Sequence, residues 1–122
     1  MSQTILVVED DEHIRHLVRT VLTREGHEVI SAHNGVSALA EIERHSPGLI
    51  ILDMHMPQMN GNDFLDVYHT MQRRVPVIII TVDPLSVSNH VEAAVGKVLI
   101  KPFTVDELLD CVREFLPRGV AE

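Results

Sequence analysis

Short apolar runs rich in valine and isoleucine alternate along this chain with segments of helical periodicity, and this alternation constrains the fold more than any other feature. Five such runs, each too short for a helix, are typical of strands: 5–8, 28–32, 49–52, 77–80 and 98–100. The segments between and after them have helical apolar spacing, which predicts helices around 14–22, 38–42, 64–71, 87–95 and 105–112. Strands that alternate with helices form right-handed βαβ units, so we expect a parallel sheet with helices on both faces.

The composition of each predicted strand indicates its position in the sheet. Three runs consist of apolar residues alone: 5–8, 49–52 and 77–80. Strands of this kind are buried on both faces and therefore lie in the centre of a parallel sheet. The mixed run 28–32 is expected at one edge, and 98–100, which follows Lys97, at the other. The predicted strand order is 2-1-3-4-5, a flavodoxin-like, doubly wound α/β fold.

All of these elements lie within residues 4–116, so we expect one domain there and a short tail at 117–122. Thr104 and Glu107 have the spacing of a capping box at the start of the last helix. Asp11 and Glu12 are expected to cap the first helix and to complement its dipole, not to join a site.

Composition and charge disfavour several classes of function. The chain of 122 residues is 45% hydrophobic, enough for a core without disulfides, and its single cysteine, Cys111, is predicted to be a small core or boundary residue. A net charge of −8 disfavours direct binding of nucleic acid, which needs clustered Lys and Arg. With no signal-peptide pattern and no apolar stretch near the ~20 residues of a membrane helix, we expect a cytoplasmic protein without a membrane partner.

Polar side chains follow the predicted strands at the ends where ligands bind in such sheets. Glu9 and Asp10 follow the first strand, Asp53 ends the third, Thr81 follows the fourth and Lys101 follows the fifth. Three carboxylates at close range repel one another unless a cation neutralises them. Mg²⁺ is bound by one or two carboxylates together with water and phosphate oxygens. The pattern therefore predicts a Mg²⁺ site in which Asp53 acts as a nucleophile and forms an acyl phosphate.

These residues lie in four motifs, in chain order: ILVVEDDE at 5–12, DMHMP at 53–57 with Gly61, Thr81, and KPF at 101–103. Together they resemble the receiver domain of bacterial two-component response regulators, of the chemotaxis-regulator type, over residues 4–116. The resemblance implies that Asp53 is the phosphoacceptor and that Lys101 and Thr81 hold the phosphoryl oxygens. It implies that Mg²⁺ is bound directly by Asp10 and Asp53, through water by Glu9, and by the backbone carbonyl of His55.

The resemblance also implies a role and partners. The phosphoryl group would come from a sensor histidine kinase or a phosphotransfer protein, and a downstream protein of unspecified identity would read the phosphorylated state. Such a receiver phosphorylates itself from its donor and is a switch, not a dedicated enzyme.

The residues disfavour three other interpretations and leave a fourth open. A phosphatase of the haloacid dehalogenase type needs a second Asp two residues after the nucleophile, where this chain has His55. In a flavodoxin, the acidic loop at 9–12 would repel the flavin phosphate. His13 and His16 lie one helical turn apart, but without a third ligand at metal spacing they are expected to be solvated surface residues. A phosphorylation-independent binding module on a receiver fold stays open, because only a phosphorylation assay excludes it.

Two positions depart from the family pattern. Val98 lies three residues before Lys101, where the family usually has an aromatic residue, and Val82 follows Thr81, where it usually has a small one. Valine has a single side-chain torsion and cannot rotate between solvent and core as an aromatic ring does. We therefore expect a conformational signal to pass through residues 82–88 and the predicted helix behind them.

Overall fold

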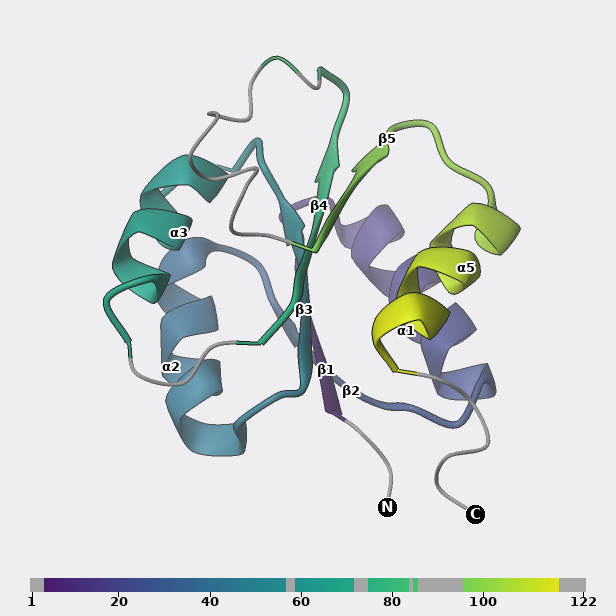
Figure 1. The fold of residues 1–122 in the computed structure, drawn as a ribbon, viewed down its shortest axis with the longest axis horizontal. Coiled ribbons are helices and arrows are strands. Elements are labelled where there is room, and N and C mark those ends of the chain that lie inside the picture. Colours follow the sequence, from purple (N-terminus) through teal and green to yellow (C-terminus); the bar gives the residue numbers. More distant parts are fainter. Residues whose placement is uncertain (1–3, 57–58, 72–74, 84, 86–95, 117–122) are drawn as a thin grey trace.

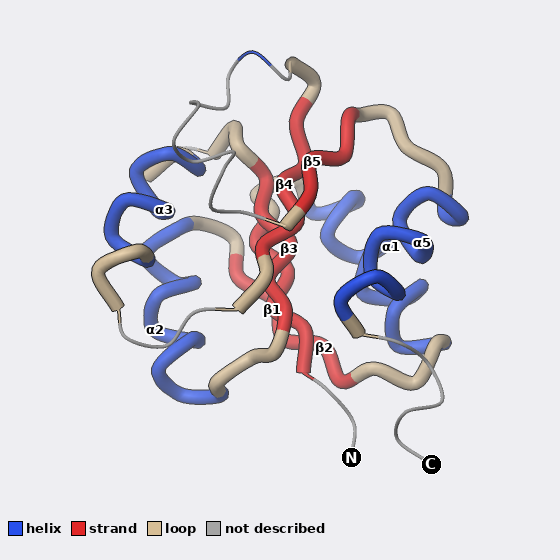
Figure 2. The backbone as a smooth tube through the Cα atoms, viewed as in Figure 1, coloured by secondary structure: helices blue, strands red, loops and turns tan. Residues whose placement is uncertain are grey.

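A computed structural model describes residues 4–56, 59–71, 75–83, 85 and 96–116. Five parallel strands form a single sheet: β1 (Thr4–Val8), β2 (Glu28–Ala32), β3 (Leu49–Asp53), β4 (Val77–Thr81) and β5 (Lys97–Ile100). Their order, β2-β1-β3-β4-β5, confirms the order expected from the sequence. Figure 2 shows these strands as a twisted central layer between helices.

The described helices cover both faces of the sheet: α1 (Glu12–Arg24), α2 (Gly35–His45), α3 (Gly61–Tyr68) and α5 (Val105–Phe115). In Figure 1, α2 and α3 lie on one side of the sheet, and α1 and α5 lie on the other. This arrangement confirms the doubly wound α/β architecture. The helix predicted around 87–95 and the tail at 117–122 fall outside the described residues. Across the described part, the helices are too short and too polar to cross a bilayer.

The strands separate two hydrophobic clusters because successive side chains of a strand point to opposite faces. On β1, Leu6 and Val8 join the cluster that packs with α2 and α3, whereas Ile5 and Val7 join the cluster that packs with α1 and α5. Every residue of β3 and β4 is buried, as expected for central strands. The edge strand β2 is buried only at Ala32. Cys111 is buried in the second cluster, as predicted.

The N-terminal caps of α1 and α5 agree with the sequence prediction, whereas the C-terminal end of α3 does not. The Asp11 carboxylate accepts hydrogen bonds from two amides at the start of α1, and Thr104 with Glu107 forms the capping box of α5. The third helix was predicted to continue to Met71, but α3 ends at Tyr68.

The early end of α3 has a local cause in the turn that follows it. The Met71 amide donates to the Tyr68 carbonyl three residues back, and the Thr70 hydroxyl donates to the Val67 carbonyl at 2.6 Å. Both contacts replace helical bonds that the last turn would otherwise need. Met71 still packs against the hydrophobic cluster, which explains its place in the apolar pattern.

Candidate functional site

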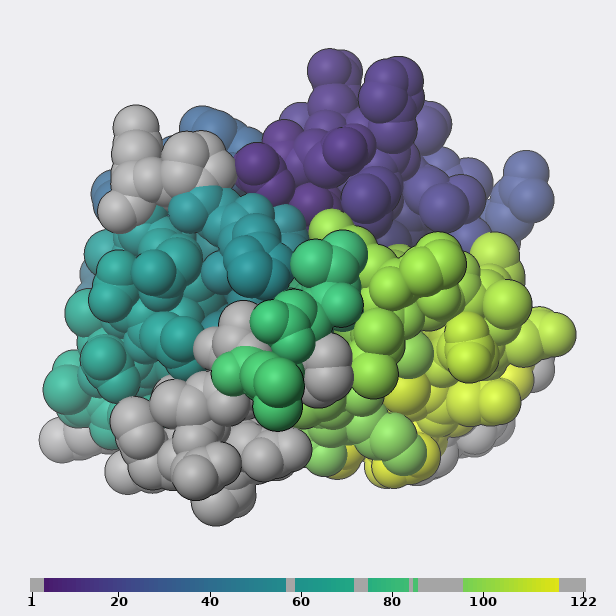
Figure 3. Space-filling model, turned by 90° about the horizontal axis from the view of Figure 1, so that it is seen from above, coloured from purple at the N-terminus to yellow at the C-terminus, as the bar shows by residue number. Residues whose placement is uncertain are grey.

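The parallel strands bring four sequence-predicted residues to one edge of the sheet. Asp53 and Thr81 are the last residues of β3 and β4, Glu9 directly follows β1, and Lys101 directly follows β5. The register places Asp53 beside Ile80 on the neighbouring strand. In Figure 3, the segments that continue from these strands, coloured purple, teal, green and yellow-green, meet near the centre of the visible face.

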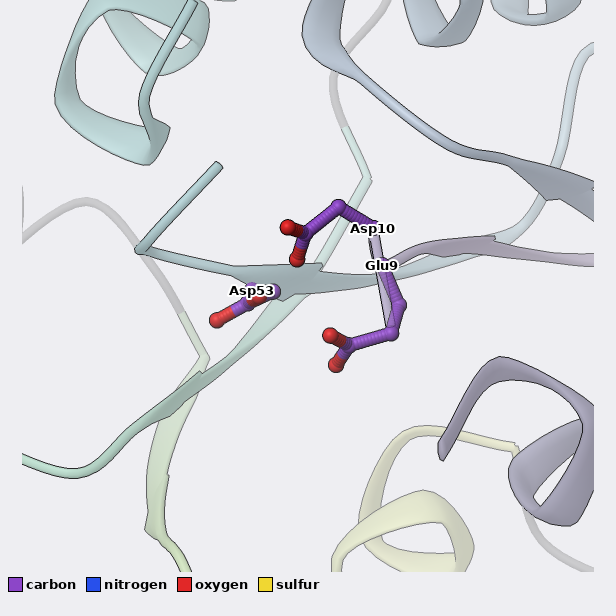
Figure 4. A group of neighbouring side chains, drawn as sticks. All are labelled: Glu9, Asp10 and Asp53. Atoms are coloured by element: carbon purple, nitrogen blue, oxygen red, sulfur yellow. The ribbon is translucent and has the colours of Figure 1, made fainter. Parts of the chain in front are cut away.

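Three carboxylates gather at this edge, as the sequence predicted. One oxygen each from Glu9, Asp10 and Asp53 lies within 4.8 Å of the other two, and Figure 4 shows the three side chains together. Glu9 and Asp53 are each only 2% exposed, while Asp10 is exposed to solvent. In the part of the chain that the structure describes, this is the one group of acidic, histidine or cysteine side chains with metal-ligand spacing. His13 and His16 therefore do not form such a group with a described third residue.

Lys101 supplies a positive charge to the two buried acids. Its Nζ atom lies 3.4 Å from Oε1 of Glu9 and 3.6 Å from Oδ1 of Asp53. The amide of Lys101 donates to the Thr81 carbonyl at 2.8 Å, which fixes the backbone of the lysine against the end of β4. One ammonium group thus contacts both buried carboxylates at once.

Burial raises the pKa values of both buried acids. Desolvation raises the pKa of Glu9 most, and a hydrogen bond and repulsion from Asp53 add to it, so that it reaches about 8 despite the opposing charge of Lys101. Desolvation also raises the pKa of Asp53. A single lysine therefore does not compensate the two buried carboxylates, and the site favours a further positive charge.

Backbone contacts hold these carboxylates in place. Oδ1 of Asp53 accepts from the His55 amide, and Oε2 of Glu9 accepts from the Asp11 amide, both at 3.2 Å. Arg15 on α1 donates from Nη1 to the carbonyl of Glu9 at 2.8 Å, which ties the end of β1 to the first helix. Sequence reasoning did not identify Arg15, although its position one turn after the acidic loop was a usable signal.

Thr81 is fully buried, and its hydroxyl is engaged with the loop that follows β4. The hydroxyl donates to the carbonyl of Asp83 at 3.0 Å and accepts from the amide of Asp83 at 3.1 Å. Nε2 of His55 lies 3.2 Å from the same oxygen. Only the backbone of His55 had been assigned a role from the sequence, and its carbonyl stays a predicted ligand.

A close contact between α3 and the loop after β3 supports the acidic site. A Cβ atom at Gly61 would overlap Sδ of Met54 and lie 2.9 Å from Cα of Met54, the residue after Asp53. The amide of Gly61 also donates to the carbonyl of Met54 at 3.1 Å. Glycine at position 61 thus allows the N-terminus of α3 to lie directly against the backbone that carries the central aspartate.

The two valines that depart from the family pattern have different environments. Val98 is half-buried against the α2–α3 cluster. Val82 is 63% exposed and lies, with Ile14, Leu17, Lys101, Pro102 and Phe103, along an apolar surface groove beside the site. Val82 therefore lies at the surface, on a groove that Lys101 also lines.

Comparison with known proteins identifies the family. The family model described as the response regulator receiver domain matches residues 5–113. Sporulation initiation phosphotransferase F of Bacillus subtilis is 34% identical over 121 residues, which cover 96% of each chain. Response regulator MprA of Mycobacterium tuberculosis is 36% identical over 125 residues; the match covers this whole chain but 54% of MprA, so the chain spans about half the length of that relative.

Solved structures agree with these sequence matches. The Thermotoga maritima response regulator TrrA, solved in complex with Mg²⁺ and BeF, superposes with a TM-score of 0.84 at 30% identity, over 93% of this chain and 98% of TrrA. The receiver domain of the Pseudomonas aeruginosa sensor histidine kinase PA1611 was solved with a magnesium ion in its active-site cleft. It superposes with a TM-score of 0.85 at 26% identity, over 95% of this chain and 98% of the PA1611 chain. The chain belongs to the family of response regulator receiver domains of two-component systems.

Proposed function

We propose that residues 4–116 form a Mg²⁺-dependent phosphoacceptor switch in which Asp53 receives the phosphoryl group. The observation that carries this proposal is the position of Asp53, which contacts Lys101 and lies in one acidic group with Glu9 and Asp10 at the carboxyl edge of the sheet. A nucleophilic carboxylate, further acids for a cation and a lysine for phosphoryl charge are the parts that aspartyl phosphorylation needs.

The transfer step is a displacement at phosphorus. A carboxylate oxygen of Asp53 forms a bond to the phosphorus atom while the bond between phosphorus and the donor nitrogen breaks. The donor imidazole leaves with the electron pair and takes up a proton from water. Lys101 stabilises the negative charge on the transferring oxygens, and Thr81 donates a hydrogen bond to one of them once it is released from Asp83.

The donor set fits Mg²⁺. Asp10 and Asp53 would bind the ion directly, Glu9 would bind it through water, and the carbonyl of His55 would complete the protein ligands. Glu9 and Asp53 are both buried beside a single lysine, which favours an added positive charge here. When bound, the ion neutralises the acids and polarises the phosphoryl oxygens. The magnesium in the PA1611 receiver and the Mg²⁺ and BeF in TrrA support the same assignment.

The phosphoryl group would come from a sensor histidine kinase or a phosphotransfer protein, and a second protein would read the phosphorylated state. The net charge of −8 favours protein partners over nucleic acid. In this role the domain is a signalling switch and not a dedicated enzyme. A cytoplasmic location belongs to the same proposal.

Incubation with a small phosphodonor, with Mg²⁺ or with chelator, tests this function by intact-mass spectrometry. The mass of one phosphoryl group should appear only with Mg²⁺ and should be absent from Asp53→Ala. An unmodified wild type, even with a matched kinase, would support the phosphorylation-independent binding module instead.

A further inference from the structure

The side chain of His55 connects the acceptor carboxylate to the buried threonine of the next strand. The amide of His55 lies 3.2 Å from Oδ1 of Asp53, and Nε2 of its ring lies 3.2 Å from the hydroxyl oxygen of Thr81. Thr81 is fully buried, whereas His55 is exposed. One residue therefore spans the distance between the proposed phosphoacceptor and the hydroxyl that would hold the phosphoryl group.

The contacts of the Thr81 hydroxyl restrict how it can be oriented. A hydroxyl has one proton to donate and two lone pairs that accept. The proton is given to the carbonyl of Asp83, and one lone pair accepts from the amide of Asp83. The contact to Nε2 of His55 is compatible with these two when Nε2 carries a proton and donates it to the hydroxyl oxygen of Thr81.

The orientation that satisfies these contacts differs from the one needed in the proposed reaction. To bind a phosphoryl oxygen on Asp53, the hydroxyl of Thr81 must withdraw its proton from the Asp83 carbonyl. The imidazole of His55 opposes this movement because its hydrogen bond to the Thr81 hydroxyl also has to be broken or redirected.

We propose that His55 is a positioning residue that holds the hydroxyl of Thr81 in its resting orientation against Asp83, and so limits how readily this receiver enters its phosphorylated conformation. The proposal rests on the proposed phosphoacceptor function and deepens it. It concerns the ring of His55, and it is independent of the role of the His55 carbonyl toward Mg²⁺.

The test uses beryllofluoride with Mg²⁺ as the probe of the phosphorylated conformation. His55→Phe keeps an aromatic ring and removes both ring nitrogens, and His55→Gln keeps an N–H donor with similar reach. Because the His55 side chain is exposed, both variants are expected to fold, which far-ultraviolet circular dichroism checks. The loss of one neutral hydrogen bond predicts that His55→Phe binds the probe about threefold to tenfold more tightly, with His55→Gln close to wild type.

A double-mutant cycle separates this role from a general effect on the loop. In a Thr81→Val background, which lacks the hydroxyl, the change His55→Phe should leave affinity for the probe unaltered. An unchanged or weakened affinity of His55→Phe in the wild-type background overturns the proposal, and so does an equal gain in the Thr81→Val background. Failure of the proposed function looks different, because wild type itself would then bind no beryllofluoride.

A second measurement examines the resting protein without any probe. The nitrogen NMR signal of Nε2 of His55 should shift when Thr81 is changed to Val, because its hydrogen-bond partner is lost. The amide signal of Asp83 should shift in His55→Phe and return toward its wild-type position in His55→Gln. Signals that do not respond would show that the ring makes no such contact in solution, which contradicts the proposal.

Discussion

Nζ of Lys101 lies 3.6 Å from Oδ1 of Asp53, and the lysine side chain is only 18% exposed. The ammonium group therefore occupies its place beside the proposed acceptor before any phosphoryl group arrives. It also lies 3.4 Å from Glu9, so its single charge is shared between two buried acids. Because one charge does not offset two, the site is expected to be unstable when both acids are ionised, and this imbalance underlies the first two predictions.

The first prediction concerns the pH dependence of stability without metal. In the folded protein Glu9 keeps its proton up to about pH 8, whereas the ordinary pKa of 4.5 applies after unfolding. Between these values the unfolded state binds fewer protons, so the free energy of unfolding should fall as pH rises. Glu9→Gln should remove this fall and be more stable than wild type on the alkaline side by about 1–3 kcal/mol. Denaturant titrations in chelator across this pH range measure the free energy of unfolding of both proteins. The eight histidines are present in both, so their contribution cancels in the comparison. Parallel pH curves for the two proteins would refute the explanation.

The second prediction concerns Mg²⁺. Added Mg²⁺ should raise the melting temperature, because a ligand of the folded state stabilises it by mass action. Asp10→Asn should lose most of this response, since Asp10 contributes an exposed oxygen to the acidic group. Glu12→Gln is the matched control: Glu12 is also exposed, but it lies in the first turn of α1 outside the group. Thermal melts with and without Mg²⁺ decide this, and equal responses of the two variants would count against the ligand assignment.

The third prediction concerns the glycine beneath the site. Gly61→Ala should destabilise the protein by about 1–3 kcal/mol, because the added methyl group meets the Sδ and backbone Cα atoms of Met54. Displacing Met54 also moves Asp53, so affinity for Mg²⁺ should fall. Asp66→Ala, at an exposed position of the same helix, should change neither quantity by a comparable amount. Chemical denaturation and Mg²⁺ titration measure both, and a Gly61→Ala protein of wild-type stability would show that the contact is readily relaxed.

The fourth prediction concerns transmission of the signal. Val98 is half-buried against the core, and its short side chain with a single torsion cannot move between solvent and core as an aromatic ring does. Beryllofluoride with Mg²⁺ should therefore change hydrogen exchange most within residues 82–95 and little at Val98. Changes in hydrogen exchange that are confined to the neighbours of Asp53 would mean that the signal is not transmitted through residues 82–95.

The fold and the acidic site follow from the sequence because they depend on local patterns. The apolar runs of β3 and β4 identify central strands, and residues at the ends of parallel strands must meet at one edge. Glu9, Asp53 and Lys101 come together for this reason. The early end of α3 was missed because it depends on a hydroxyl contact from Thr70, which periodicity does not report.

Two features of the site required three-dimensional information. The ring of His55 reaches Thr81 across 26 positions of sequence, and no pattern within one strand or loop indicates such a contact. The ammonium group of Lys101 contacts both buried acids because its distances to Glu9 and Asp53, 3.4 Å and 3.6 Å, are nearly equal. Both features depend on how the loops after the strands pack. The sequence specifies which residues lie in these loops, but not where their side chains point.

The most direct test of the account locates the phosphoryl group. Wild type is treated with a phosphodonor and Mg²⁺, trapped at the acyl phosphate stage and analysed by peptide mass spectrometry, beside Asp53→Asn and Asp10→Asn. Modification is expected at Asp53 in wild type, none in Asp53→Asn, and little in Asp10→Asn because the metal site is damaged. A phosphoryl group on His55, or modification that persists in Asp53→Asn, would contradict it.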